Sequence, residues 1–286
     1  MDAHNGMGMV ASHKMMEMLI EKAKVNGVAA GAVYNSTHYG IAGYWTTMAE
    51  KAGMIGFTGT NARPSVAPTF GVEPMMGTNP LTVTMPTDEE FPFNFDCATS
   101  IVQNGKIEYY ERSGKPTPAG LVVTKDGNTM TDSGEILKEM RKGNCALLPV
   151  GGMGEETGGY KGYGFVTIVE ILSAALAGGP HTKALSGKNA EGQNDFYRLG
   201  HFFFVINPEF FAGVDTFKKT SGDILRALRG STKAPGQERI YTAGEKEHLA
   251  WVEREPLGVP VGETIQKEFI ALRDECGLDY KFPFEK

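Results

Sequence analysis

Residues 81–95 read LTVTMPTDEEFPFNF, and this stretch holds two β-strand patterns with only a turn between them. Residues 81–85 and 91–95 are rich in β-branched, aromatic and other apolar side chains, whereas residues 86–90 carry the proline and the acidic residues typical of a turn. Strands that follow each other without a helix between them indicate an antiparallel or mixed sheet, because parallel sheets alternate strand and helix.

On both sides of this stretch the sequence predicts a mixture of helices and strands. The predicted helices cover 8–26, 41–52, 101–112, 135–142, 163–177, 214–229 and 263–276, and the further strands cover 28–34, 54–60, 120–124 and 201–206. The helix over 163–177 carries apolar residues in nearly every direction, so we expect it to be buried. The predicted fold class is α/β (α+β), with a mainly antiparallel or mixed sheet and flanking helices, and not a doubly wound sheet.

Composition excludes several classes of protein. The chain has 286 residues, 41% of them hydrophobic, with 28 Lys and Arg against 34 Asp and Glu and a net charge of -6. This length allows one large domain or two intimate ones. No apolar run reaches the roughly 18 residues of a membrane span, and no basic stripe indicates nucleic-acid binding. The widely spaced Cys97, Cys145 and Cys276 are typical of a reducing compartment, so we expect a soluble, cytoplasmic protein without a metal site.

His38 is the histidine whose sequence context favours a catalytic role. It follows the predicted buried strand 28–34 and stands two residues before Gly40, where a ligand can approach the backbone closely. An imidazole titrates near neutrality, so a histidine placed in such a loop can exchange a proton with a hydroxyl or carbonyl group. A structural role is the alternative interpretation, and it is the commoner one for a lone histidine.

Three other segments allow both a binding and a structural interpretation. Residues 96–100 (DCATS) could expose amides to an anion or could cap the following helix. Lys161, within glycine-rich sequence, could meet a phosphate, while Cys97 is more typical of a small apolar residue than of a nucleophile. Residues 6–11 (GMGMVA) fit the loose dinucleotide pattern, but no strand precedes them, so a glycine-rich helix start is the simpler interpretation.

A series of segments in register resembles the malate/L-lactate dehydrogenase family that does not use the Rossmann fold. That family also includes sulfolactate, ureidoglycolate and cyclic-imine (piperideine) carboxylate oxidoreductases. The segments are 6–8 (GMG), 35–44 (NSTHYGIAGY), 53–56 (GMIG), 60–61 (TN), 77–80 (GTNP), 95–100 (FDCATS), 159–164 (GYKGYG), 200–203 (GHFF), 206–208 (INP) and 244–247 (GEKE). The resemblance implies the family's non-Rossmann, L-sulfolactate-dehydrogenase-like fold and a homodimer with active sites near the subunit interface.

The resemblance also implies the chemistry: reversible hydride transfer between NAD, or NADP, and the C2 carbon of a 2-hydroxy or 2-oxo acid, most simply malate/oxaloacetate or L-lactate/pyruvate. His38 falls on the family's proton donor and acceptor position. The positions matching coenzyme contacts are Ala62, Asp96, Cys97, Ala98, Lys161, Ala243, Gly244 and Glu245. Relatives often carry a serine at the position of Ala62 and a proline at that of Ala243. Coenzyme choice stays open, with Arg63 a candidate partner for the 2′-phosphate of NADP.

We expect residues 1–286 to form a coenzyme-binding domain with intimately packed C-terminal helices. Relatives also carry, ahead of the counterpart of Met1, a helical segment whose Ser-His-Gly motif and arginines approach the substrate and help to hold its carboxylate. The sequence shows no counterpart of that segment, so we expect reduced activity of this chain by itself. The alternative hypothesis is a catalytically silent coenzyme-binding or interaction protein. A different acceptor, such as sulfopyruvate or a cyclic imine acid, is the remaining possibility.

Overall fold

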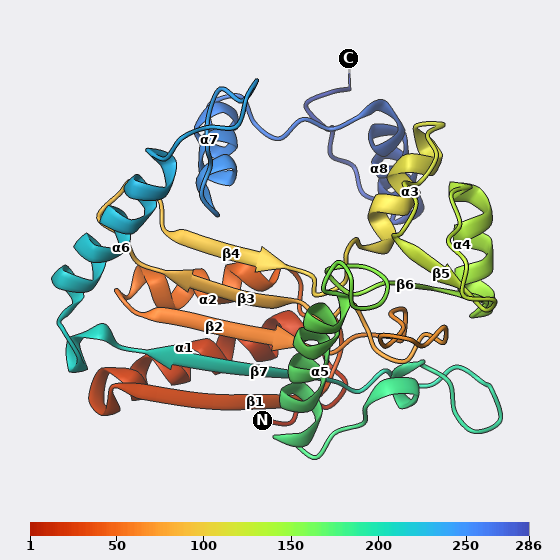
Figure 1. Ribbon diagram of the computed structural model, residues 1–286, viewed down its shortest axis with the longest axis horizontal. Coiled ribbons are helices and arrows are strands. Elements are labelled where there is room, and N and C mark those ends of the chain that lie inside the picture. The colour runs from red at the N-terminus through yellow and green to blue at the C-terminus, as the bar shows by residue number, and fades with distance from the viewer. Residues whose placement is uncertain (286) are drawn as a thin grey trace. The chain divides into compact units, whose positions relative to one another are not determined.

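The computed structural model describes residues 1–285, which divide into a unit over residues 1–244 and a second unit that begins at residue 245. In the first unit, five strands form one antiparallel sheet in the order β1-β7-β2-β3-β4 (Figure 1). These strands are β1 (Val28–Ser36), β2 (Ile55–Thr60), β3 (Leu81–Met85), β4 (Phe93–Cys97) and β7 (Leu199–Ile206). The antiparallel sheet predicted from the consecutive strands is thereby confirmed.

Strand β4 begins two residues later than its sequence pattern predicts. Pro92 has no backbone N–H and cannot donate to the sheet, so regular pairing with β3 starts at Phe93. The strand then continues to Cys97, opposite Leu81. As a result Asp96 lies within the strand and not in a turn leading to a helix.

Helices α1 (Gly8–Asn26) and α2 (Ala42–Lys51) cover one face of the sheet (Figure 1). The main core lies between these helices and the strands, because both contribute apolar side chains that are almost wholly buried, such as Met16 from α1, Trp45 from α2 and Phe203 from β7. Both helices were predicted within two residues of their observed ends.

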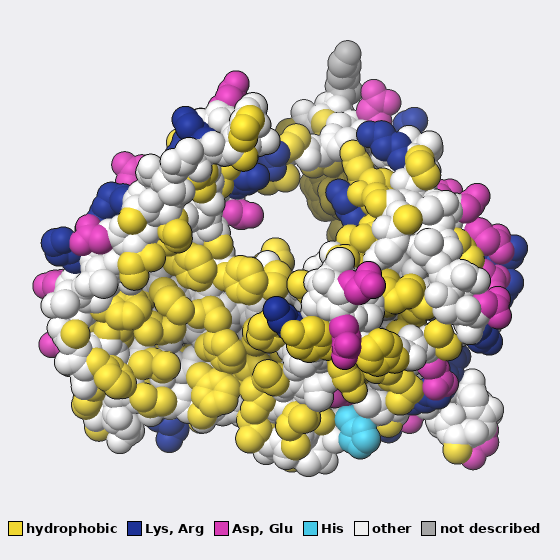
Figure 2. Space-filling model, viewed as in Figure 1, with side chains coloured by type: hydrophobic (Ala, Val, Ile, Leu, Met, Phe, Trp, Pro, Cys, Tyr) yellow, Lys and Arg dark blue, Asp and Glu magenta, His cyan; other side chains and the backbone are white. Residues whose placement is uncertain are grey.

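The opposite face of the sheet, here called the open sheet face, is apolar as well. Alternation along the strands places on it Val28, Ala32, Ile55, Phe57, Val83, Phe93, Phe95, Phe202, Phe204 and Ile206. Figure 2 shows apolar side chains spread across this side of the molecule. Val28 and Phe95 remain 48% and 42% exposed, so the chain does not bury this face completely.

Helix α5 (Gly159–Ala175) packs across one end of the open sheet face (Figure 1). The prediction that this helix is buried all round is wrong. Val166 is fully buried, but Phe165, Ile168 and Ile171 on the outer side are 49%, 48% and 55% exposed. The apolar residues on that side lack a covering layer within the described chain.

A second, smaller core lies beside the sheet. It is built from β5 (Val122–Thr124), β6 (Cys145–Leu147), α3 (Asn104–Arg112) and α4 (Ser133–Lys142). Two short 3₁₀ helices, η1 (Thr182–Leu185) and η2 (Pro208–Phe210), lie outside this core. Ile107, Ile136 and Leu147 are fully buried in it. Helix α4 begins where the Asp132 carboxylate accepts the Glu135 N–H at 2.8 Å.

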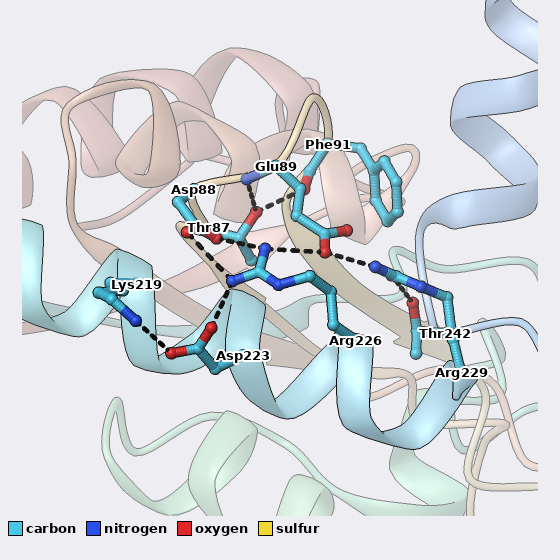
Figure 3. A network of polar contacts seen from close by, with 9 residues as sticks. All are labelled: Thr87, Asp88, Glu89, Phe91, Lys219, Asp223, Arg226, Arg229 and Thr242. Carbon is cyan, nitrogen blue, oxygen red and sulfur yellow. Dashed lines mark hydrogen bonds and ion pairs between the residues drawn. The ribbon is translucent and has the colours of Figure 1, made fainter. Parts of the chain in front are cut away.

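Helix α6 (Val214–Arg229) is joined to the turn between β3 and β4 by a network of charges (Figure 3). Arg226 donates to Asp88 at 2.9 and 3.1 Å and to Glu89 at 3.2 Å. Arg229 also donates to Glu89, and it reaches Thr242 Oγ1 at 3.1 Å. The network therefore fixes the outer end of the sheet and the chain segment that follows α6.

The second unit contains α7 (Glu245–Arg254) and α8 (Glu263–Glu275). Its last described residues are tied to α8, since Arg273 donates to the Glu285 carboxylate at 2.7 Å. No helix within residues 1–285 has both the length and the apolar character that crossing a bilayer requires. The expectation of one domain over 1–286 with intimately packed C-terminal helices stays a prediction.

Candidate active site

One edge of the sheet gathers the loops that the sequence singled out. Strands β1 and β2 end there on either side of the start of β7, with Ser36 opposite Leu199 and Thr60 opposite His201. The start of β3 and the end of β4 reach the same edge, because Leu81 pairs with Cys97. The antiparallel order thus brings together residues far apart in sequence.

A cleft of about 1590 Å³ opens at this edge, and its wall includes His38, Ala62 and Asp96. Pockets for small molecules commonly measure roughly 300–1,000 Å³, so the cleft has room for a dinucleotide and a small acid together. Residues 60–65 belong to its lining together with small residues such as Gly40, Ala42 and Ser186, which suits close approach of a large, flat ligand. The residues present therefore fit a nicotinamide coenzyme.

His38 lies exposed on the loop that follows β1. Its Nδ1 accepts the Gly40 N–H at 3.0 Å, so the neutral ring carries its proton on Nε2. The start of α1 holds this loop through the Thr37 hydroxyl, which accepts the Gly8 N–H and donates to the Gly6 carbonyl. A Cβ on Gly8 would lie 2.3 Å from Thr37 O, so only glycine fits there. The glycines of residues 6–11 thus start a helix and support the His38 loop.

His201 is fully buried beneath the His38 loop, a placement that sequence reasoning missed. Its ring nitrogens lie 2.6 Å from Thr60 Oγ1 and 2.8 Å from Ser36 Oγ, and its ring stacks on Tyr39 with centroids 4.5 Å apart. Burial lowers the pKa of His201 to about 3, with the nearby charge of His38 acting in the same direction. A histidine within the apolar strand 199–206 was the available signal, because such a residue must find polar partners in the core.

Ala62 is held at the cleft by side chains from neighbouring loops. Its N–H donates to Asn79 Oδ1 at 3.2 Å, and Asn79 in turn donates to Glu170 at 2.7 Å. The preceding Asn61 accepts the Gly200 N–H at 2.8 Å. Because these partners are buried, the backbone of the 60–63 loop is fixed before any ligand binds.

Asp96 does not cap the helix that follows it in sequence, which begins only at Asn104. Its carboxylate accepts the Gly43 N–H in the first turn of α2 at 2.7 Å and the Thr82 hydroxyl at 2.8 Å. The prediction that this segment caps a helix was thus right that a side chain accepts a backbone N–H of a first helical turn. It was wrong about the helix, which is α2 and not the helix that follows in sequence. Burial, followed by the charge of Asp96, raises the pKa of the Cys97 thiol, as expected of a small apolar residue and not of a nucleophile.

The remaining predicted coenzyme positions are more widely spread. Lys161 lies exposed in the first turn of α5, its Nζ 5.7 Å from the Tyr160 ring centroid, and is not on the cleft wall. Ala243 lies against β4, where its carbonyl accepts the Asn94 N–H at 3.2 Å, and it follows the Thr242 that Arg229 holds (Figure 3). The cleft wall also omits Cys97, Ala98 and Gly244, while Glu245 opens the second unit. The roles of all these residues stay predictions.

Comparison with known proteins identifies the family. Residues 1–269 match the family model described as malate/L-lactate dehydrogenase. A malate dehydrogenase of Pyrococcus horikoshii is 40% identical over 97% of this chain and 74% of its own length, and an L-sulfolactate dehydrogenase of Methanocaldococcus jannaschii is 34% identical over 97% and 75%. Among solved structures, a malate dehydrogenase of Entamoeba histolytica is 43% identical and superposes with a TM-score of 0.93 over 98% of this chain and 77% of its own.

The agreement extends to relatives with other printed activities, such as a ureidoglycolate dehydrogenase of Escherichia coli that is 30% identical over 94% of this chain and 72% of its own length. Sequence and fold thus agree along nearly the whole chain. The chain belongs to the malate/L-lactate dehydrogenase family of oxidoreductases, and its dehydrogenase relatives imply a nicotinamide coenzyme.

Proposed function

We propose that this chain catalyses hydride transfer between NAD and the C2 carbon of malate/oxaloacetate, with L-lactate/pyruvate as the next substrate pair and NADP as the second coenzyme. The observation that carries the proposal is His38, an exposed imidazole on the wall of a cleft that also contains Ala62 and Asp96. A bound nicotinamide supplies the hydride donor and acceptor. The protein must then bind the acid and move one proton at its C2 oxygen.

His38 is the group that handles this proton. Gly40 occupies Nδ1, so Nε2 is the nitrogen left to face a substrate oxygen. In the form shown, Nε2–H can donate a hydrogen bond to the oxygen of a 2-oxo acid. Proton transfer at Nε2, in either direction, interconverts the imidazolium and the neutral ring that keeps its proton on Nδ1. Nδ1 therefore carries a proton during both oxidation and reduction, and the bond from Gly40 must open in both halves of the cycle.

The proposal is tested by assaying the protein with oxaloacetate and pyruvate, each with NADH and with NADPH, beside direct titration of coenzyme binding. We expect coenzyme oxidation with oxaloacetate. Coenzyme binding without turnover of either acid would support the silent coenzyme-binding protein instead. The dehydrogenases among the relatives do not favour that alternative.

We further propose that a second copy of the chain covers the open sheet face and the outer side of α5, forming the homodimer that the sequence resemblance implies. Both surfaces are apolar and lie on elements whose other sides face the protein core. Monomeric proteins rarely expose large contiguous apolar surfaces. We expect light scattering to give twice the chain mass of 30.9 kDa. An Ile168→Asp variant should shift the protein to monomer, because it places an unpaired charge in the interface.

Met18→Asp is the matched control, since Met18 is also 48% exposed but lies on α1, across the sheet from α5. The control should remain dimeric. A parent protein that has the mass of one chain at all concentrations would refute the homodimer.

A further inference from the structure

We infer that Arg63 determines the substrate class of this site by pairing with a second acidic group, a carboxylate or sulfonate, at the end of the substrate remote from C2. The inference rests on the proposed function. Arg63 lies on the loop that follows β2, and His38 lies on the loop that follows β1. Both loops leave the same edge of the sheet, one on each side of β7.

This topology sets the separation between the points where the two loops begin. Neighbouring strands are about 4.8 Å apart, so loops on either side of one intervening strand start about 10 Å apart. A four-carbon acid placed between the two side chains can offer its C2 oxygen to His38 and its far end to Arg63. Both residues line the same cleft.

The Arg63 guanidinium has no acidic partner among residues 1–285. The guanidinium lies over the ring of Tyr197, whose centroid is 5.5 Å away. That ring packs directly on Gly187, where an added Cβ would lie 2.3 Å from the ring. The Tyr197 ring thus lies against the exposed guanidinium without neutralising its charge, so Arg63 can still pair with an anion.

The other charged groups of the cleft are already engaged or lie elsewhere. Lys183 is paired with Glu73, Glu108 lies 3.9 Å from Arg112 on α3, and Asp96 accepts the hydrogen bonds from α2 and β3 described above. Arg141 also lines the cleft, but it belongs to α4 in the smaller core and donates to Leu137 O at 3.1 Å. Arg63 is therefore the cation available at the sheet edge, beside the proposed proton donor.

A guanidinium recognises a carboxylate or sulfonate through two parallel, charge-assisted hydrogen bonds. A substrate with a neutral tail forms none of them and leaves Arg63 in water as before. The expected consequence is a preference for 2-hydroxy acids with an anionic tail over those with an alkyl tail. A variant without the Arg63 guanidinium should lose this preference for an anionic tail.

The kinetic test compares malate with L-lactate in the parent protein and in Arg63→Gln. We expect kcat/KM for malate to fall by about 10- to 150-fold, the value of a hydrogen bond to a charged group, while that for L-lactate changes by less than about threefold. Arg141→Gln removes a cation from the same cleft and should leave the malate-to-lactate ratio unchanged. An Arg63→Gln variant with the parent ratio would overturn the inference.

A binding measurement separates this inference from the proposed function. Succinate has both carboxylates but no hydroxyl to oxidise, and butyrate has one carboxylate. Calorimetry should show that the parent binds succinate more tightly than butyrate, and that Arg63→Gln loses this difference even if no acid is turned over. The inference would be refuted if Arg63→Gln kept the preference for succinate over butyrate and instead changed the ratio of NADPH affinity to NADH affinity. That result would assign Arg63 to the 2′-phosphate of the coenzyme.

Discussion

Replacing His38 with glutamine is expected to lower kcat for malate oxidation by about 10²- to 10⁴-fold, the usual contribution of a positioned acid or base. Glutamine keeps a polar side chain of similar reach but cannot take up the hydroxyl proton. His38 is exposed and bonded only to Gly40 by its ring, so the fold should be unaffected. Coenzyme affinity, measured by fluorescence titration, should stay within about twofold of the parent.

The matched control is His13→Gln. His13 is a second exposed histidine, on α1, where its ring lies 3.2 Å from the Glu17 carboxylate. This variant should retain full turnover. If His38→Gln oxidised malate at the parent rate, His38 would have no part in proton transfer and the structural interpretation of this residue would hold.

His201 is expected to make the stability of the protein fall with acidity, and His201→Gln should remove that contribution. The folded protein holds the ring neutral down to a pKa of about 3, whereas the ordinary value is 6.5. Between these values the unfolded chain binds the proton and the folded chain does not. Stability from this residue is thus fully present above pH 6.5 and is lost as the pH falls toward 3, by about 1.4 kcal/mol per pH unit at most.

Urea unfolding of the parent and of His201→Gln at several pH values from 7 to 4 measures this effect. At pH 7 the variant should be less stable by about 1–3 kcal/mol, because one of the hydroxyls of Ser36 and Thr60 loses its buried partner. The difference between the two proteins should then shrink as the pH falls. His38→Gln, which changes an exposed ring, is the control for histidine loss, and equal pH slopes in the parent and His201→Gln would contradict the prediction.

Much of the sheet was predictable because its strands have clear local signals. Both predicted boundaries lie within two residues of the observed strand ends for four strands, predicted over 28–34, 54–60, 81–85 and 201–206. Strand β6 was missed because Cys145–Leu147 is too short for any periodicity to appear. Helix α7 was missed because Glu245–Arg254 is rich in charged residues and its start was interpreted only as a coenzyme contact.

The errors at α5 and Asp96 have a common physical origin. An all-apolar helix shows that burial is favourable, but the sequence does not show whether the covering surface belongs to the same chain, and the outer side of α5 is exposed here. Likewise, an aspartate before small hydroxylated residues indicates that it will accept backbone N–H groups. Which helix offers them depends on pairing between β3 and β4 and on the position of α2, which are set by distant parts of the chain.

The candidate site shows the same division. His38 and Ala62 were predicted from loop context and family resemblance, and both line the same cleft, while their roles stay predictions. His201 has no loop signal, since its importance comes from joining the ends of β1 and β2 through two hydroxyls. Such a role requires strand order, which the sequence pattern alone did not supply.

The position of β7 between β1 and β2 has a consequence for synthesis of the protein. About 140 residues separate Thr60 from its partner His201, so β1 must wait for residues 199–206 before it can join the sheet, and β2 can pair only with β3 until then. Until the ribosome has released that segment, both strands present unpaired edges that can associate with other chains. Completion of the sheet is therefore slow, and folding is sensitive to the concentration of nascent chains. The demand for chaperones should be greatest while the last third of the polypeptide is being made.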